Sequence, residues 1–175
     1  MTFESLPPRM IDQDELRELV SVVAARPELW RRYVAFRDQE RHFVSLHRDA
    51  HVDVWVICWT PRNDTGWHDH DVSSGAVAVV EGELVEHHLA VLRDSASRVV
   101  RAGAAFSFGA DYIHRLTGST PGAVSIHAYS PPLWRMGQYV VDRDGLLHRT
   151  SVSYADELRP IRDEPGLGEL AATAT

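Results

Sequence analysis

Three histidines in this sequence stand at spacings that suit a metal ion: His68 and His70 in GWHDHD, and His114 in FGADYIHRLTG. On a strand, residues two apart point to the same face, about 7 Å apart along the chain, so two imidazoles can reach one ion. A third nitrogen from another strand completes one face of an octahedron and leaves sites open for further ligands. A His-x-His pair alone is more often a surface or packing pair, so His114 decides in favour of a metal site.

A second group of polar residues, Ser125, His127 and Tyr129, alternates along SIHAYSPP. On a strand all three point the same way, towards the interior of a barrel if Ile126 and Ala128 face outward. A buried Tyr–His–Ser chain can orient a phenolic O–H near a bound reactant and hold its proton. The alternative is that Tyr129 only fills the interior and that its hydroxyl merely finds a partner there.

The segments around these residues predict many short strands. From residue 43 to about 150, alternating or wholly apolar runs such as VDVWVICW, AAFSFG and GQYVVDRDG are separated by Gly, Pro, Asn and Asp. This pattern is typical of a β-sandwich or a closed β-barrel and not of βαβ units. The strands would bring residues distant in sequence onto one interior surface.

Two helices are expected before the strands. Residues 12–25 predict a helix that Asp12 or Asp14 can cap, and a second short helix, PELWRRYVAF, begins at Pro27. The apolar stripe of the first helix consists of Leu16, Leu19, Val20 and Val23.

We expect a single domain over residues 1–175. It divides into an N-terminal helical segment at 1–38, a β-barrel at 39–150 and a C-terminal tail at 151–175, which is rich in Pro, Gly and Ala from Asp156 onward.

Composition excludes several classes of partner. The net charge of −7 argues against a nucleic-acid partner, and no apolar run approaches the roughly 18 residues of a membrane-spanning helix. The opening residues show no signal-peptide pattern, and the lone Cys58 cannot form an intrachain disulfide, so we expect a cytoplasmic protein. All eighteen basic residues are arginines, which excludes Schiff-base lysine chemistry. A monomer and a homodimer both remain open.

Two motifs resemble those of the cupin superfamily. The first runs Arg62, five residues, His-x-His, four residues, Gly75, six residues, Gly82. The second runs Gly103, five residues, Gly, four residues, His114. The resemblance implies an all-β cupin (jelly-roll) β-barrel with short N-terminal helices.

The cupin pattern usually has a ligating glutamate where this chain has Gly75 or Ser74. Three neutral imidazoles would then bind the metal without a carboxylate. The ion would keep its full positive charge and favour an anionic ligand such as a thiolate.

Beyond these motifs, residues from about 40 to 135 resemble the cysteine dioxygenase (thiol dioxygenase) family in ICWTP, GWHDHD, VVEGELVE, IHRL and, most specifically, SIHAYSPP. The resemblance implies an Fe(II) cofactor, with a small thiol and O2 as the reacting partners. Ser125, His127 and Tyr129 match a hydrogen-bonded relay beside the iron in the family. Trp59 matches a family tryptophan nine residues before the first iron ligand.

Two departures from the family bear on the substrate. Some relatives link a cysteine near the iron to the relay tyrosine, but Gly75 stands there and no crosslink is expected. The family's Tyr-x-Arg, whose Arg binds the cysteine carboxylate, aligns with Phe43 and Ser45, although a shift of one or two residues places Arg41 or Phe43 in the slot. Arg135 lies roughly where relatives that act on 3-mercaptopropionate carry an arginine. The predicted substrate contacts are therefore Arg41, Phe43, Ser45, Trp59, Gly75 and Arg135.

The leading hypothesis is an Fe(II)-dependent dioxygenase that uses O2 to oxidise a small thiol, other than free L-cysteine, to a sulfinic acid. Its catalytic residues would be Tyr129, His127 and Ser125. One alternative keeps the iron and oxidises a specialised metabolite that is not cysteine. Another alternative is a non-catalytic cupin that only binds a small ligand. The Tyr–His–Ser relay argues against this alternative, since binding alone needs no proton relay.

Overall fold

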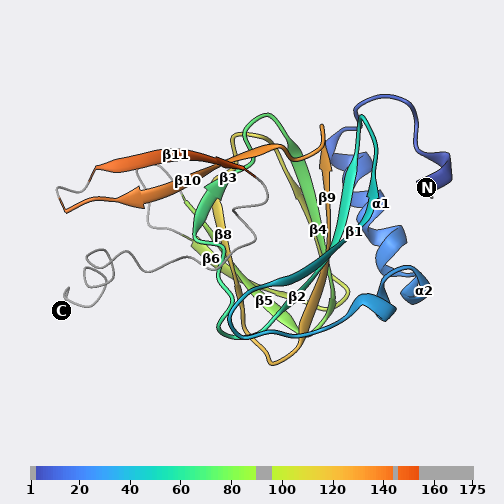
Figure 1. Ribbon diagram of the computed structural model, residues 1–175, viewed down its shortest axis with the longest axis horizontal. Coiled ribbons are helices and arrows are strands. Elements are labelled where there is room, and N and C mark those ends of the chain that lie inside the picture. The colour runs from blue at the N-terminus through green and yellow to red at the C-terminus, as the bar shows by residue number, and fades with distance from the viewer. Residues whose placement is uncertain (1–2, 90–95, 144–145, 154–175) are drawn as a thin grey trace.

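The computed structural model describes residues 3–89, 96–143 and 146–153. The strands in these residues are β1 (His42–Arg48), β2 (Asp53–Trp59), β3 (Trp67–Asp69), β4 (Ser74–Glu81), β5 (Glu83–His88), β6 (Ala96–Arg101), β7 (Ala105–Phe108), β8 (His114–Gly118), β9 (Ala123–Ser130), β10 (Arg135–Val141) and β11 (Leu147–Ser153). They pair antiparallel into one sheet of order β1-β2-β9-β4-β7 and a second of order β11-β10-β3-β8-β5-β6. The two sheets lie on opposite sides of a common interior (Figure 1), which confirms the predicted all-β fold.

The N-terminal helices cover the outer face of the first sheet (Figure 1). Helix α1 (Gln13–Ala24) begins at the predicted cap, because the Asp12 side chain accepts hydrogen bonds from the backbone N–H groups of Asp14 and Glu15. The second helix is shorter than predicted: α2 (Pro27–Trp30) passes into a 3-10 turn, η2 (Arg31–Tyr33), and the chain is extended at Val34. A single helical turn makes few hydrogen bonds to offset the free-energy cost of helix nucleation, so the burial of Trp30 stabilises this helix. A further 3-10 turn, η1, spans Phe3–Ser5.

Strand β9 is buried on both faces. Its outward residues, Ile126 and Ala128, pack in one apolar cluster with the buried stripe of α1, so helix rather than solvent covers that face. Its inward residues face the barrel interior, where a second apolar cluster includes Trp59 and Phe108. The relay residues predicted from sequence lie on this inward face.

The β10–β11 hairpin projects to one side of the barrel (Figure 1). Strand β11 pairs with β10 from Leu147 to Ser153, so the β region extends past residue 150 into the segment expected as a tail. Most of its side chains are exposed, and an edge strand of this kind lacks the apolar alternation by which strands are predicted from sequence. The rest of the expected tail, 154–175, lies outside the described residues. Among those described, no helix is long and apolar enough to span a membrane.

Candidate metal centre

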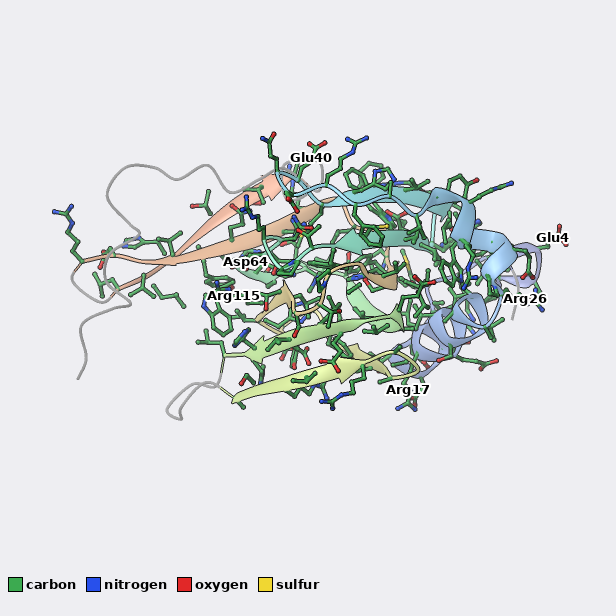
Figure 2. All side chains as sticks on the ribbon, turned by 90° about the horizontal axis from the view of Figure 1, so that it is seen from below. Glu4, Arg17, Arg26, Glu40, Asp64 and Arg115 are labelled. Carbon is green, nitrogen blue, oxygen red and sulfur yellow. The ribbon has the colours of Figure 1, made fainter. Side chains whose placement is uncertain are left out.

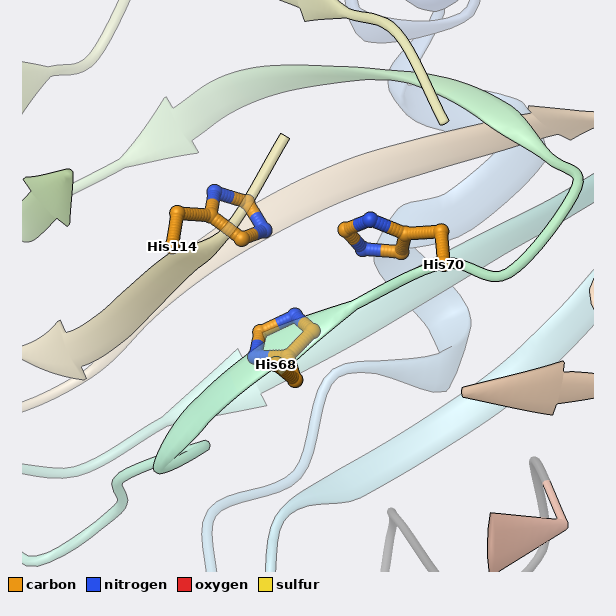
Figure 3. A group of neighbouring side chains, drawn as sticks. All are labelled: His68, His70 and His114. Carbon is orange, nitrogen blue, oxygen red and sulfur yellow. The ribbon is translucent and has the colours of Figure 1, made fainter. Parts of the chain in front are cut away.

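The three histidines predicted as ligands come together between the sheets. His68 lies in β3, His70 follows that strand directly, and His114 opens β8, where it pairs with His68 across the sheet. One potential ligand atom from each residue lies within 4.8 Å of the others, and all three residues are at most 3% exposed. Figure 3 shows the rings turned towards one another. This geometry suits a single ion.

The protonation of the rings also fits a metal ion. His68 Nδ1 lies 3.1 Å from the Gly66 carbonyl oxygen, and His114 Nδ1 lies 3.1 Å from Glu86 Oε1. If both Nδ1 atoms donate, each ring presents its Nε2 lone pair, the form in which histidine binds metals. His70 Nδ1 is buried and has no hydrogen-bond partner among the described residues. Burial lowers the pKa of His68 and of His70 well below the ordinary value, so both rings are neutral.

Glu86, which sequence reasoning did not identify, lies directly behind His114. It is 1% exposed, and its Oε1 atom accepts from His114 Nδ1 and, at 3.2 Å, from the Tyr112 hydroxyl. Arg98 Nε donates to Oε2 at 2.5 Å. Burial alone would raise the pKa of Glu86, but the hydrogen bonds and charges of His114 and Arg98 outweigh burial and lower it. One feature of the sequence points to this role of Glu86. It stands two positions after Leu84, so the two side chains share a face of β5, and that face is buried.

Asp69 stands between His68 and His70 and points away from them. Its carboxylate accepts from Arg149 Nε at 2.7 Å, from the Tyr139 hydroxyl at 2.6 Å and from the backbone N–H of Gly137 at 3.0 Å. These bonds outweigh burial, which would raise the pKa of Asp69, and lower that pKa. The β10–β11 hairpin therefore fixes β3, which carries His68 and leads directly into His70.

The loop before β3 is fixed from the other side. The carboxylate of Asp64 accepts from Arg115, the residue after His114, at 2.9 and 3.0 Å, and Figure 2 labels the two residues beside one another. The Thr65 hydroxyl accepts from the backbone N–H of Leu116 at 2.9 Å. These contacts hold the segment that leads into His68 against the strand that begins with His114.

The predicted relay residues form a hydrogen-bonded chain on β9. Ser125 Oγ lies 2.8 Å from His127 Nε2, and His127 Nδ1 lies 3.2 Å from the Tyr129 hydroxyl. Trp59 Nε1–H donates to Ser125 Oγ at 2.8 Å. Burial, followed by the charges of His114 and Arg41, lowers the pKa of His127 to about 3. The Tyr129 ring stacks on His70 at 5.4 Å between centroids, so the chain ends at the histidine cluster.

Arg41 is the buried cation beside this chain. It is 6% exposed, and its guanidinium carbon lies 5.5 Å from the centroid of the Trp59 ring. Burial lowers the pKa of His68 and of His127, and the charge of Arg41 adds to that lowering at both. The positive charge of Arg41 therefore acts on both rings.

The other predicted substrate contacts lie in different surroundings. Phe43 is 36% exposed and stacks on Trp55 at 5.2 Å. Ser45 is exposed, as is Arg135 at the start of β10. The described structure thus brings Arg41 and Trp59 to the relay, while Phe43, Ser45 and Arg135 lie nearer the surface.

Gly75 faces Tyr129 across the pairing of β4 with β9. A Cβ atom at this position would overlap the ring of Phe108 and would lie 3.1 Å from Tyr129 Cδ1. Phe108 itself packs against two of the histidines, with ring centroids 4.6 Å from that of His70 and 4.8 Å from that of His114. The aromatic ring occupies the space that a side chain at position 75 would need, so glycine is required there.

A cavity of about 380 Å³ lies away from these residues, on the helix-covered face of the first sheet. It is lined mainly by small residues of α1, β4 and β7 together with Trp30 and Arg31. It contains none of the groups described above and is not the metal centre.

Solved structures with similar folds support the architecture. A protein from Thermus thermophilus matches with a TM-score of 0.51 and 16% identity, over 58% of this chain and 92% of its own. A Klebsiella pneumoniae protein described as having a double-stranded β-helix domain matches with a TM-score of 0.51 and 13% identity, over 69% of this chain and 92% of its own. The fold and its histidine cluster thus define a β-barrel of the cupin class.

Within that class the chain belongs to the cysteine dioxygenase type I family, whose profile matches residues 4–141. It is 25% identical to cysteine dioxygenase type 1 of Danio rerio, over 70% of this chain and 67% of that protein. It is 24% identical to the Homo sapiens protein of the same name, over 70% of this chain and 66% of that protein. The chain spans about two thirds of the length of these relatives.

Proposed function

We propose that this protein is an Fe(II)-dependent dioxygenase that uses O2 to oxidise a small thiol to a sulfinic acid, and that free L-cysteine is not its preferred substrate. The observation that carries the proposal is the position of the relay, because its tyrosine stacks on one of three buried, converging histidines. Membership of the cysteine dioxygenase family supports the same chemistry. Both oxygen atoms of O2 enter the product, so RSH and O2 give RSO2H and no further reductant is needed.

His68, His70 and His114 would bind the iron. When bound, Fe(II) supplies the one-electron chemistry that lets O2 react with a thiolate. The three ligands are neutral, so the ion keeps a net positive charge that favours a thiolate over a neutral thiol.

The relay would place a proton at the reaction site. Trp59 Nε1–H can only donate, so Ser125 accepts there and gives its own hydroxyl proton to His127 Nε2. The single proton of the neutral His127 ring then sits on Nδ1 and is donated to the Tyr129 oxygen. In this arrangement the phenolic proton of Tyr129 is directed away from His127 and can be donated to a reactant at the histidines.

Arg41 would bind a carboxylate of the substrate. A buried carboxylate needs a cationic partner, and the chain contains no lysine. Arg41 is buried next to the relay, whereas Phe43 and Ser45, which align with the family's Tyr-x-Arg, offer a ring and a hydroxyl at a more exposed position. A thiol that carries only a carboxylate, such as 3-mercaptopropionate, matches this single arginine better than L-cysteine, whose ammonium also needs a partner.

The direct test is aerobic incubation of the Fe(II)-loaded protein with L-cysteine, 3-mercaptopropionate, cysteamine and larger thiols. O2 uptake and product mass are followed, with ¹⁸O2 to count the oxygen atoms transferred. We expect a sulfinic acid carrying two labelled atoms, and no turnover by His114→Ala, which should also lose most of its iron. Full iron occupancy in that variant would refute the metal assignment. O2 uptake with a sulfur-free metabolite but with no thiol would favour the alternative oxygenase, and no uptake at all would favour a binding protein.

A further inference from the structure

The surroundings of the three histidine rings differ in charge. The Nδ1 atom of His68 faces a neutral backbone carbonyl, and that of His70 has no hydrogen-bond partner among the described residues. The Nδ1 atom of His114 instead faces the carboxylate of Glu86 at 3.1 Å, and both side chains are 1% exposed. A carboxylate that accepts the distal N–H of a metal-binding histidine makes the other ring nitrogen a stronger donor.

The charge on Glu86 is only partly offset by its arginine. The Arg98 side chain is 56% exposed, so water screens its charge, and its guanidinium lies over the Phe106 ring at 4.6 Å. The contact between Glu86 and His114 is shielded from water, and electrostatic interactions are stronger there. The negative charge therefore acts more strongly on His114 than the positive charge of Arg98 does.

We infer that Glu86 is a positioning residue that sets the charge and donor strength of His114 without occupying a coordination position. In this way it supplies the negative charge that a ligating glutamate at Gly75 or Ser74 would bring, and leaves that position open for a reactant. The inference rests on the metal site proposed above. It predicts that affinity for a divalent cation depends on the charge of Glu86 and not only on its shape.

Strand β5 offers a matched control. Glu83 and Glu86 each pair across the β5–β6 register with an arginine, Glu83 with Arg101 and Glu86 with Arg98. Arg101 Nε donates to Glu83 Oε1 at 2.9 Å, but Glu83 is part-exposed and its side chain lies outside the histidine cluster. Glu86→Gln and Glu83→Gln therefore remove one charge each from equivalent cross-strand pairs, and only the first removes a charge beside His114.

The test measures the Co(II) dissociation constant of the metal-free full chain, by absorbance in competition with a chelator. Glutamine at position 86 can still accept from His114 Nδ1–H through its one oxygen, so the ring keeps its orientation, while the charge and the hydrogen bond from Arg98 are lost. We expect Glu86→Gln to weaken Co(II) binding 10- to 100-fold and Glu83→Gln to change it less than about 2-fold, the scale of a lost surface ion pair. In the Fe-loaded protein, Glu86→Gln should also shift the Fe(III)/Fe(II) midpoint potential to more positive values, because a negative charge favours Fe(III).

Equal Co(II) affinity for folded Glu86→Gln and for the unmodified protein would overturn the inference. If Glu86→Gln fails to fold, Arg98→Met replaces it, because this change keeps an apolar stem over Phe106 and leaves the charge of Glu86 less compensated. Binding that is unchanged or tighter supports the inference, and a loss of more than 10-fold overturns it. Failure of the unmodified protein to bind either Co(II) or Fe(II) would instead refute the metal site itself.

Discussion

Replacing Arg41 by methionine should remove the activity of the protein towards thiols that carry a carboxylate. Methionine keeps an unbranched apolar stem against the Trp59 ring and loses the guanidinium of Arg41, a residue that is only 6% exposed. Removing one partner of a buried, hydrogen-bonded charge pair costs about 2–5 kcal/mol. At about 1.4 kcal/mol per factor of ten, this predicts a fall in kcat/KM of about 30-fold to several thousand-fold for 3-mercaptopropionate.

The assay compares kcat/KM for 3-mercaptopropionate and cysteamine in the unmodified protein, in Arg41→Met and in Arg135→Met. Cysteamine has no carboxylate, so its kcat/KM should change by less than about 3-fold in Arg41→Met if the iron and the relay are intact. Arg135 is exposed at the start of β10, and its replacement should leave both values unchanged. The assay is run at pH 7.5, where the loss of Arg41 should not change the protonation of His127. Burial, followed by the charges of His114 and Arg41, lowers the pKa of that ring to about 3, so the ring is neutral with or without Arg41.

Three results would contradict the proposed substrate site. An equal loss for both thiols would make Arg41 a structural residue of the relay, and full activity of Arg41→Met on 3-mercaptopropionate would place the carboxylate elsewhere. Efficient, saturable oxidation of L-cysteine by the unmodified protein would show that another group replaces the Tyr-x-Arg of the family. That result would refute the proposed substrate preference and leave the proposed iron site unaffected.

The other predictions concern the relay, the packing at β4 and acid stability. Tyr129→Phe should keep the metal and lower kcat about 100-fold, the scale of a positioned proton donor; unchanged turnover on the true substrate would make Tyr129 a packing residue. Gly75→Ala should lower the free energy of unfolding by about 1–3 kcal/mol, because its Cβ would overlap Phe108. In a double-mutant cycle measured by chemical denaturation, adding Phe108→Leu should recover part of this loss. The metal-free protein should lose stability as the pH falls below about 6.5, because the unfolded His127 ring takes up a proton that the folded ring accepts only at about 3. Protonation of His127 in the unfolded state should lower the free energy of unfolding by about 2 kcal/mol at pH 5. Chemical denaturation of His127→Gln should therefore show a free energy of unfolding that depends less on pH. The same pH dependence in the variant and in the unmodified protein would contradict this prediction.

The parts of the site that the sequence predicts are those set by local geometry. Ser125, His127 and Tyr129 share a face of β9 because they alternate along it. His68 and His70 keep the same spacing of two across the end of β3, and both belong to the histidine cluster. Asp12 caps α1 through contacts within three residues. Such features depend on the strand or helix alone, so the pattern of residue types is enough to predict them.

The remainder depends on which strands become neighbours. Glu86 reaches His114 because β5 pairs with β8, and nothing within GELVEHH specifies that partner. Arg41 precedes β1, where no alternation fixes the direction of a side chain, so the sequence left several residues in competition for the carboxylate site. The length of β11 was missed because exposed polar residues form a strand there only through pairing with β10.

The bond from the Gly137 backbone N–H to Asp69 gives the hairpin a further property. Exchange of this amide proton with solvent requires that its bond to the Asp69 carboxylate break, and Asp69 is the residue between His68 and His70. A ligand that binds only the closed arrangement stabilises it by RT ln(1 + [L]/Kd), and the same increment slows the exchange. Hydrogen exchange at Gly137 therefore measures occupancy of the histidines from outside the barrel interior, without substrate, turnover or a coloured metal.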